Sequence, residues 1–206
     1  MKTILADTTR IAGQLDRVNS MSYCEVSDVF EEDGPPTDHF HGGFGLLNLQ
    51  GIRKPSFFAY RFLNQLGDTE FACDDEDTIV CGSENGYQIL TWNPTFRQNM
   101  ENILYYGSDL PPQSEEDVRI TLHGVKNGRY TVRICSVGYQ KNDAYTAFLQ
   151  IPHGDSLSRA KTEELKTLAN GHPESEYVTE ITDGEFTHTA VLRDNDVCLI
   201  ILEKDD

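Results

Sequence analysis

Apolar and polar residues alternate along several short stretches in the second half of the chain. Val118, Ile120 and Leu122 are separated by polar residues, and Tyr130–Cys135 repeats this period of two. Such alternation is typical of strands with one buried and one solvated face. Strands separated by turn-forming residues are predicted over Thr78–Cys81, Tyr87–Trp92, Val118–Leu122, Tyr130–Cys135, Phe186–Leu192 and Val197–Leu202. Short strands in this succession predict a β-sandwich from about residue 71 to the end of the chain.

Three stretches follow the helical period instead. The apolar positions predict helices over Thr8–Arg17, Pro55–Leu66 and Ser158–Leu168. Pro55 suits the first helical position, because its missing N–H would have no partner there. Ser156 or Ser158 can cap the third helix, which interrupts the strand-rich half. A short strand, Met21–Val26, is predicted between the first helix and a long loop.

Composition narrows the classes of partner. Lys and Arg total 17 against 34 Asp and Glu, a formal net charge of −17. Nucleic acid and anionic membrane surfaces are therefore not expected as partners, because both attract basic residues. The 38% of hydrophobic residues can fill a core. The five cysteines are odd in number and widely spaced, so we expect reduced, mostly buried thiols in a cytoplasmic protein without a leader.

The loop Ser27–Gly45 concentrates the candidate chemistry. Glu31 and Glu32 could act as an acid/base pair, but neighbours in an extended segment point to opposite sides, and a solvated acidic loop is the alternative. His39 and His41 have the composition of metal ligands but no third ligand at fixed spacing. We therefore expect neither a metal nor a cofactor. Trp92 is either a sugar-stacking platform or, as its usual burial favours, a core residue.

Several stretches together resemble glycoside hydrolase family 39, which contains β-xylosidases. Ser27–Glu32, Phe40–Leu46 and Lys54–Tyr60 are similar to the last part of the catalytic barrel of that family. Gly86–Asn93 and Leu122–Gly128 are similar to parts of its C-terminal β-sandwich. The resemblance extends over nearly the whole chain.

The resemblance implies a mainly β fold, in which an α/β remnant of a (β/α)8 barrel precedes a C-terminal β-sandwich with one inserted helix. Residues 1–70 would hold the last barrel strand, its loop and the flanking helices, and residues 71–206 the sandwich. By resemblance, Glu31 and Glu32 match the segment that reaches the hydroxyls of the terminal sugar. His41 and Phe44 match the support of that segment.

The chain departs from the family pattern in two places. The acid/base glutamate of the family follows an asparagine, and no Asn-Glu pair occurs here, so neither catalytic glutamate can be assigned. The tryptophan that would line the sugar pocket is replaced by Cys24. We therefore expect the C-terminal portion of a β-xylosidase-like hydrolase that is catalytically incomplete alone and binds a xylose-containing saccharide only when the barrel is completed.

Two other functions stay open. The chain could be a non-catalytic β-sandwich accessory or interaction protein, or a metal- or sugar-binding module that uses His39, His41 and Trp92. An apolar patch further predicts a homo-oligomer through residues 1–66, because barrel-facing side chains would otherwise meet water. The patch comprises Phe44, Leu46, Leu47, Phe57, Phe58 and Phe62.

Overall fold

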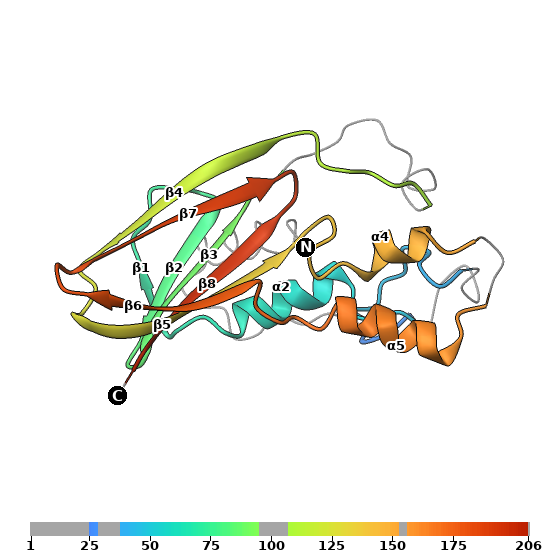
Figure 1. Cartoon of the computed structure of the whole chain (residues 1–206), viewed down its shortest axis with the longest axis horizontal. Helices are drawn as coiled ribbons and strands as arrows, with labels where there is room; N and C mark the ends of the chain where they lie inside the picture. The colour runs from blue at the N-terminus through green and yellow to red at the C-terminus, as the bar shows by residue number, and fades with distance from the viewer. Residues whose placement is uncertain (1–24, 29–37, 95–106, 153–155, 206) are drawn as a thin grey trace. The chain divides into compact units, whose positions relative to one another are not determined.

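A computed structural model describes residues 25–28, 38–94, 107–152 and 156–205 (Figure 1). The chain forms two compact units that interleave along the sequence. The first comprises Met1–Tyr60, Phe96–Pro111 and Tyr139–Asn170, and the second Arg61–Thr95, Pro112–Gly138 and Gly171–Asp206. The expected domains 1–70 and 71–206 rest on the family resemblance and stay a prediction. None of the helices in the described ranges is long and apolar enough to cross a membrane.

Two antiparallel sheets build the second unit (Figure 1). The larger contains, in spatial order, β1 (Thr69–Phe71), β2 (Thr78–Ser83), β3 (Gly86–Trp92), β8 (Val197–Lys204), β5 (Gly128–Val137) and β6 (Ser175–Ile181). The smaller pairs β4 (Glu115–His123) with β7 (Glu185–Arg193). The mainly β, antiparallel architecture is thereby confirmed.

The alternating apolar residues of both sheets meet in one core. Val132 of β5 and Ile200 of β8 are fully buried in it, and Val118, Ile120 and Leu122 of β4 pack against it. Trp92 is 2% exposed, which confirms the core interpretation over the sugar platform. Tyr130 Oη donates a hydrogen bond of 2.7 Å to the Lys126 carbonyl, so the loop before β5 is tied to the core.

The six strands predicted from residue 71 onward are confirmed, each within a few residues of its expected bounds. Two strands were not predicted, β1 and β6. β1 has only three residues, all exposed. β6 is exposed along most of its length, and its apolar residues Tyr177 and Val178 lie on opposite faces, so no single hydrophobic face identifies it.

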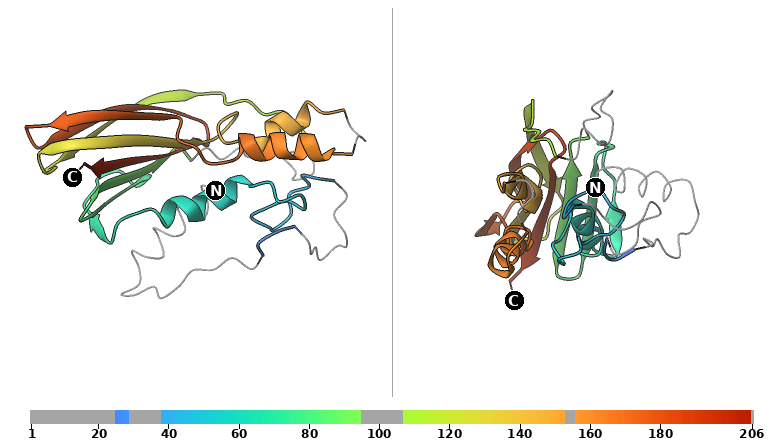
Figure 2. Two further views of the ribbon diagram at one scale, coloured as in Figure 1. Left: turned by 60° about the horizontal axis from the view of Figure 1, so that its bottom comes forward. Right: turned by 90° about the vertical axis from the view of Figure 1, so that its right-hand side faces the viewer.

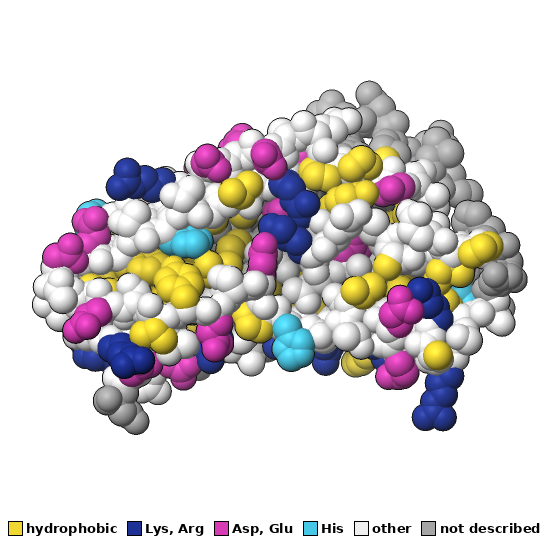
Figure 3. All heavy atoms as spheres, in the orientation of Figure 1, with side chains coloured by type: hydrophobic (Ala, Val, Ile, Leu, Met, Phe, Trp, Pro, Cys, Tyr) yellow, Lys and Arg dark blue, Asp and Glu magenta, His cyan; other side chains and the backbone are white. Residues whose placement is uncertain are grey.

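The smaller sheet leaves part of the inner face of the larger sheet open. Tyr177 of β6 lies opposite the core residue Val132, yet 38% of its surface is exposed. Figure 3 shows hydrophobic side chains gathered between β7 and β6. His188 of β7 lies opposite Ile120, and its ring stacks on Phe186 with centroids 6.4 Å apart. Burial lowers the pKa of His188 below its usual value.

The described part of the first unit is helical and irregular. Two helices, α4 (Ala144–Leu149) and α5 (Arg159–Leu168), follow β5 and precede β6 in the sequence, where the sequence pattern predicts one helix. The two helices contact each other and lie side by side (Figure 2). Asp143 caps α4 by accepting hydrogen bonds from the amides of Tyr145 and Thr146. Ser158 caps α5 through a bond from Lys161 N to its hydroxyl, which confirms one of the two predicted caps.

A third helix, α2 (Pro55–Leu63), begins at the predicted proline and ends three residues before the predicted Leu66. Tight turns end it, because Gln65 N and Leu66 N donate to carbonyls only three residues back. Phe58 and Phe62 are fully or almost fully buried, so the expected exposed patch is wrong for these two residues. Helix Thr8–Arg17 and most of strand Met21–Val26 lie outside the described residues.

Candidate functional site

A buried ion pair in the first unit joins two segments that flank the glycine-rich loop. Lys54 Nζ lies 2.8 and 3.0 Å from the two carboxylate oxygens of Asp28. The Asp28 side chain is 1% exposed and that of Lys54 14%. A carboxylate this deeply buried requires a compensating charge and hydrogen bonds, which the lysine supplies.

The same pair fixes the path of the loop Gly42–Gly45. Asp28 Oδ1 accepts a 2.7 Å hydrogen bond from Gly45 N, and Lys54 Nζ donates a 2.6 Å bond to the Gly43 carbonyl. A Cβ atom on Gly45 would lie 2.4 Å from Asp28 N. Glycine is therefore required at position 45, because any side chain would push the loop away from the ion pair.

Backbone hydrogen bonds hold the two charged segments in register. Asp28 N donates to the Leu47 carbonyl at 3.0 Å, and Leu47 N donates to the Val26 carbonyl at 2.9 Å. Lys54 N donates in turn to the Leu46 carbonyl at 2.9 Å. Residues 46 and 47 thus lie between the two charged segments and bring Asp28 and Lys54 together across 26 positions of sequence.

The buried residue Asn48 ties the far side of the loop. Its Oδ1 accepts hydrogen bonds from the amides of Gln50 and Ile52, and its Nδ2 donates to the His39 carbonyl at 3.2 Å. Near α5, Arg53 donates a 2.7 Å bond to the Asn170 carbonyl. These contacts fix the backbone on both sides of the loop within the described part of the unit.

Aromatic contacts place the start of the loop against α4. The Phe40 ring lies 4.9 Å from the Phe148 ring and 5.8 Å from the Tyr145 ring, centroid to centroid. His39 meets the Phe148 ring edge-on at 5.9 Å. His39 is thus engaged in packing rather than directed toward a shared ligand with His41.

Of the four predicted site residues, the structure describes His41 and Phe44. Glu31 and Glu32 lie outside the described residues. His41 is half-buried, and its Nδ1 lies 3.1 Å from the Asp38 carbonyl, to which it donates when Nδ1 is protonated. Phe44 follows two glycines and is 53% exposed. The loop therefore presents one imidazole and one exposed aromatic ring from a backbone held by Asp28 and Lys54.

Sequence reasoning did not assign a role to Asp28, Lys54 or Asn48. The sequence offers a partial signal for Lys54 alone, because this lysine directly precedes Pro55, the first residue of the largely apolar helix α2. Glu25, at the start of the described segment, has a buried Oε2 atom without a hydrogen-bond partner. No group of three or more metal-ligating side chains occurs among the described residues.

Two of the buried cysteines are poor nucleophiles. Cys81, Cys135 and Cys198 are buried, and Cys73 is exposed. Burial raises the pKa of the Cys81 and Cys135 thiols above their usual value. Because only the thiolate is a strong nucleophile, these two buried residues are inert packing groups, as expected from the sequence.

Comparison with known proteins agrees with the predicted resemblance. Residues 5–186 match the family model of the glycosyl hydrolases family 39. A β-xylosidase of Geobacillus stearothermophilus is 31% identical over 189 residues, which cover 92% of this chain and 34% of that protein. The chain therefore spans about a third of the length of this relative.

Solved structures show the same relationship. A family 39 enzyme from Xanthomonas axonopodis pv. citri superposes with a TM-score of 0.90 and 29% identity, over 99% of this chain and 40% of that one. A monomeric β-xylosidase from Caulobacter crescentus CB15 gives a TM-score of 0.81 and 37% identity, over 92% and 38% of the two chains.

Proposed function

This chain belongs to glycosyl hydrolase family 39, and on that premise we propose that it is the C-terminal portion of a β-xylosidase-like glycoside hydrolase. The observation that carries the proposal is the extent of the match, which includes the loop held by Asp28 and Lys54 as well as most of the second unit. We further propose that residues 1–70 contribute the last strand, loop and flanking helices of a (β/α)8 barrel.

The loop would take part in binding the terminal sugar. Glu31 and Glu32 would accept hydrogen bonds from sugar hydroxyls, and the His41 imidazole would donate or accept one. The exposed Phe44 ring would supply an apolar surface for the sugar. One observation supports the assignment of His41 and Phe44: buried polar contacts fix the backbone at Gly43 and Gly45, on either side of Phe44. Binding groups gain affinity when they are held in place before the ligand arrives.

The reaction itself would depend on carboxylates from outside this sequence. Retaining glycosidases need two carboxyl groups about 5–5.5 Å apart, one as nucleophile and one as acid/base. The 206 residues contain no Asn-Glu pair to match the acid/base position of the family. The chain alone is therefore expected not to hydrolyse xylosides, and its role is to complete and support the sugar site.

A chimaera tests this proposal. The chain would replace the 189 matching residues of the Geobacillus stearothermophilus β-xylosidase, whose remaining part supplies the barrel. We expect hydrolysis of 4-nitrophenyl β-xyloside by the chimaera and none by the chain alone. Glu31→Gln and Glu32→Gln should each raise KM, whereas Glu163→Gln, on the exposed surface of α5, should leave it unchanged.

The alternative is a non-catalytic accessory or interaction protein. A chimaera that folds but does not turn over substrate would favour this alternative and contradict the proposal. Turnover by the isolated chain would contradict the proposed need for external carboxylates. The two failures are distinguishable, because only the second requires a catalytic pair within the 206 residues.

A further inference from the structure

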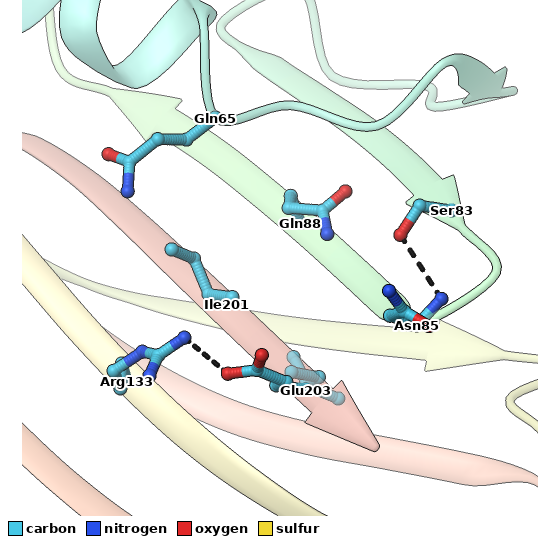
Figure 4. A pocket seen from close by; sticks show the side chains of 8 residues that line it. Gln65, Ser83, Asn85, Gln88, Arg133, Ile201 and Glu203 are labelled. Atoms are coloured by element: carbon cyan, nitrogen blue, oxygen red, sulfur yellow. Dashed lines mark hydrogen bonds and ion pairs between the residues drawn. The ribbon is translucent and has the colours of Figure 1, made fainter.

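A polar hollow lies on the outer face of the larger sheet, the face turned away from β4 and β7 (Figure 4). Its volume is about 250 Å³, and it lies wholly within the second unit. Ile201 of β8 lies at its centre, between Gln88 of β3 and Arg133 of β5 in the cross-strand register. Polar side chains surround this apolar centre: Gln65, Ser83, Asn85, Gln88, Arg133 and Glu203.

The cross-strand row next to Gln88, Ile201 and Arg133 contains a glycine. Gly86 lies between Ser83 and Glu203 in the register, on the same outer face as Gln88. A Cβ atom on Gly86 would lie 1.8 Å from the Leu202 carbonyl oxygen, and the φ angle of this residue is +152°. Glycine is therefore required at position 86 by the close approach of β8, which fixes the backbone between Ser83 and Glu203 at the rim of the hollow.

Gln88 offers a preoriented donor to the hollow. The side chain is only 7% exposed, and its Oε1 accepts a 2.8 Å hydrogen bond from Gly67 N. Gly67 is itself locked, since a Cβ atom there would lie 2.2 Å from the Gly82 carbonyl oxygen. This bond fixes which way the amide faces. The Nε2 group consequently points away from Gly67, and no described residue accepts a hydrogen bond from it.

A charged pair forms the opposite side of the hollow. Arg133 donates a 2.5 Å bond to Glu203 Oε2, and their side chains are 35% and 51% exposed. A paired guanidinium and carboxylate retain further N–H donors and oxygen lone pairs that can bind neutral hydroxyl groups. Because the pair is neutral overall and the chain carries a net charge of −17, the hollow does not suit an anion.

We propose that this hollow is a non-catalytic saccharide-binding subsite. Sugar hydroxyls are both donors and acceptors, and the hollow presents an amide donor, a guanidinium and a carboxylate around the apolar Ile201 side chain. Its volume corresponds to roughly eight waters of liquid, the size class of one sugar ring rather than of a larger ligand. The subsite goes beyond the proposed function, since none of its residues belongs to the loop described above.

Titration of the 15N-labelled full chain with xylotriose tests the proposal. We expect saturable shifts at Gly67, the Gln88 side-chain amide and Ile201, with weak affinity because the hollow is open and small. Arg133→Met should weaken binding about tenfold, by removing a charged donor. Gln88→Glu keeps an oxygen for Gly67 N but removes the amide donors, and it should weaken binding similarly.

Arg129→Met is the matched control. Arg129 lies on the same strand and pairs with Asp205 at 3.0 Å, but it does not line the hollow. The affinity of the Arg129→Met variant for xylotriose should stay within about twofold of the affinity of the unaltered chain. The proposal is overturned if no saturable shift occurs at the hollow, or if Arg133→Met, folded by its amide spectrum, binds as tightly as Arg129→Met.

Discussion

Removal of the Lys54 charge is the most direct test of how the glycine loop is held. In Lys54→Met the aliphatic part of the side chain stays, while Asp28 loses the ammonium group 2.8 and 3.0 Å from its oxygens. The carboxylate would keep its bond from Gly45 N but no opposite charge from position 54. The Gly43 carbonyl would also lose its donor.

The geometry of the pair allows the loss of stability in Lys54→Met to be estimated. At 2.8 Å and an effective dielectric constant of about 20, the attraction between the two charges is about 6 kcal/mol, part of which offsets their desolvation. Removing one partner of a buried pair costs about 3–5 kcal/mol. Because the Lys54 side chain is 14% exposed, we expect a loss at the lower end of this range, about 3 kcal/mol in the free energy of unfolding. With a denaturant dependence of ~2 kcal/mol/M, this loss lowers the urea midpoint by about 1.5 M.

The assay compares this variant with an exposed pair of equal length in the same unit. Lys161 lies 2.8 Å from Glu164 on α5, with both side chains more than a third exposed. Lys161→Met should change the free energy of unfolding by no more than about 0.5 kcal/mol. Hydrogen exchange at Gly45 N supplies a local readout and should become faster in Lys54→Met only. Equal urea midpoints for the two variants would refute the argument.

Three further outcomes follow from other features. Burial lowers the pKa of His188, so the unfolded chain binds more protons than the folded one, and the free energy of unfolding should fall as the pH drops below about 6.5. In urea titrations at several pH values, His188→Leu should reduce this fall. The control His123→Leu, at an exposed position of β4, should not reduce it. Glu25→Thr removes a buried oxygen that has no partner and should raise the free energy of unfolding by about 1–3 kcal/mol, so an unchanged midpoint would contradict the reading of that atom as unsatisfied. Light scattering at micromolar concentration should report a homo-oligomer formed through residues 1–66, and a 23.2 kDa monomer would contradict it.

The sequence predicted those strands that have a clear buried face. In β5, Tyr130, Val132 and Ile134 are buried and alternate with more exposed residues, so the period of two is visible. In β6, Val178 is 51% exposed, and the strand is placed by its pairing with β5 rather than by its own hydrophobic pattern. Helix α4 has six residues, too few for a helical period, and its start is set by the Asp143 cap.

The candidate site was less predictable, since its central contact joins residues that are distant in sequence. Asp28 and Lys54 are 26 positions apart, and their meeting depends on backbone bonds through Leu46 and Leu47. Local propensity carries no information about that register. The family resemblance identified the segments, but it did not identify the ion pair that holds them together.

The interleaving of the two units has a consequence for inheritance and engineering. Three segments of one unit alternate with three segments of the other along the backbone. No single cut or crossover can therefore separate them, and neither can be transplanted as a contiguous module. A recombination event that keeps either unit intact must transfer both units. We therefore expect this stretch of sequence to be inherited whole among related enzymes.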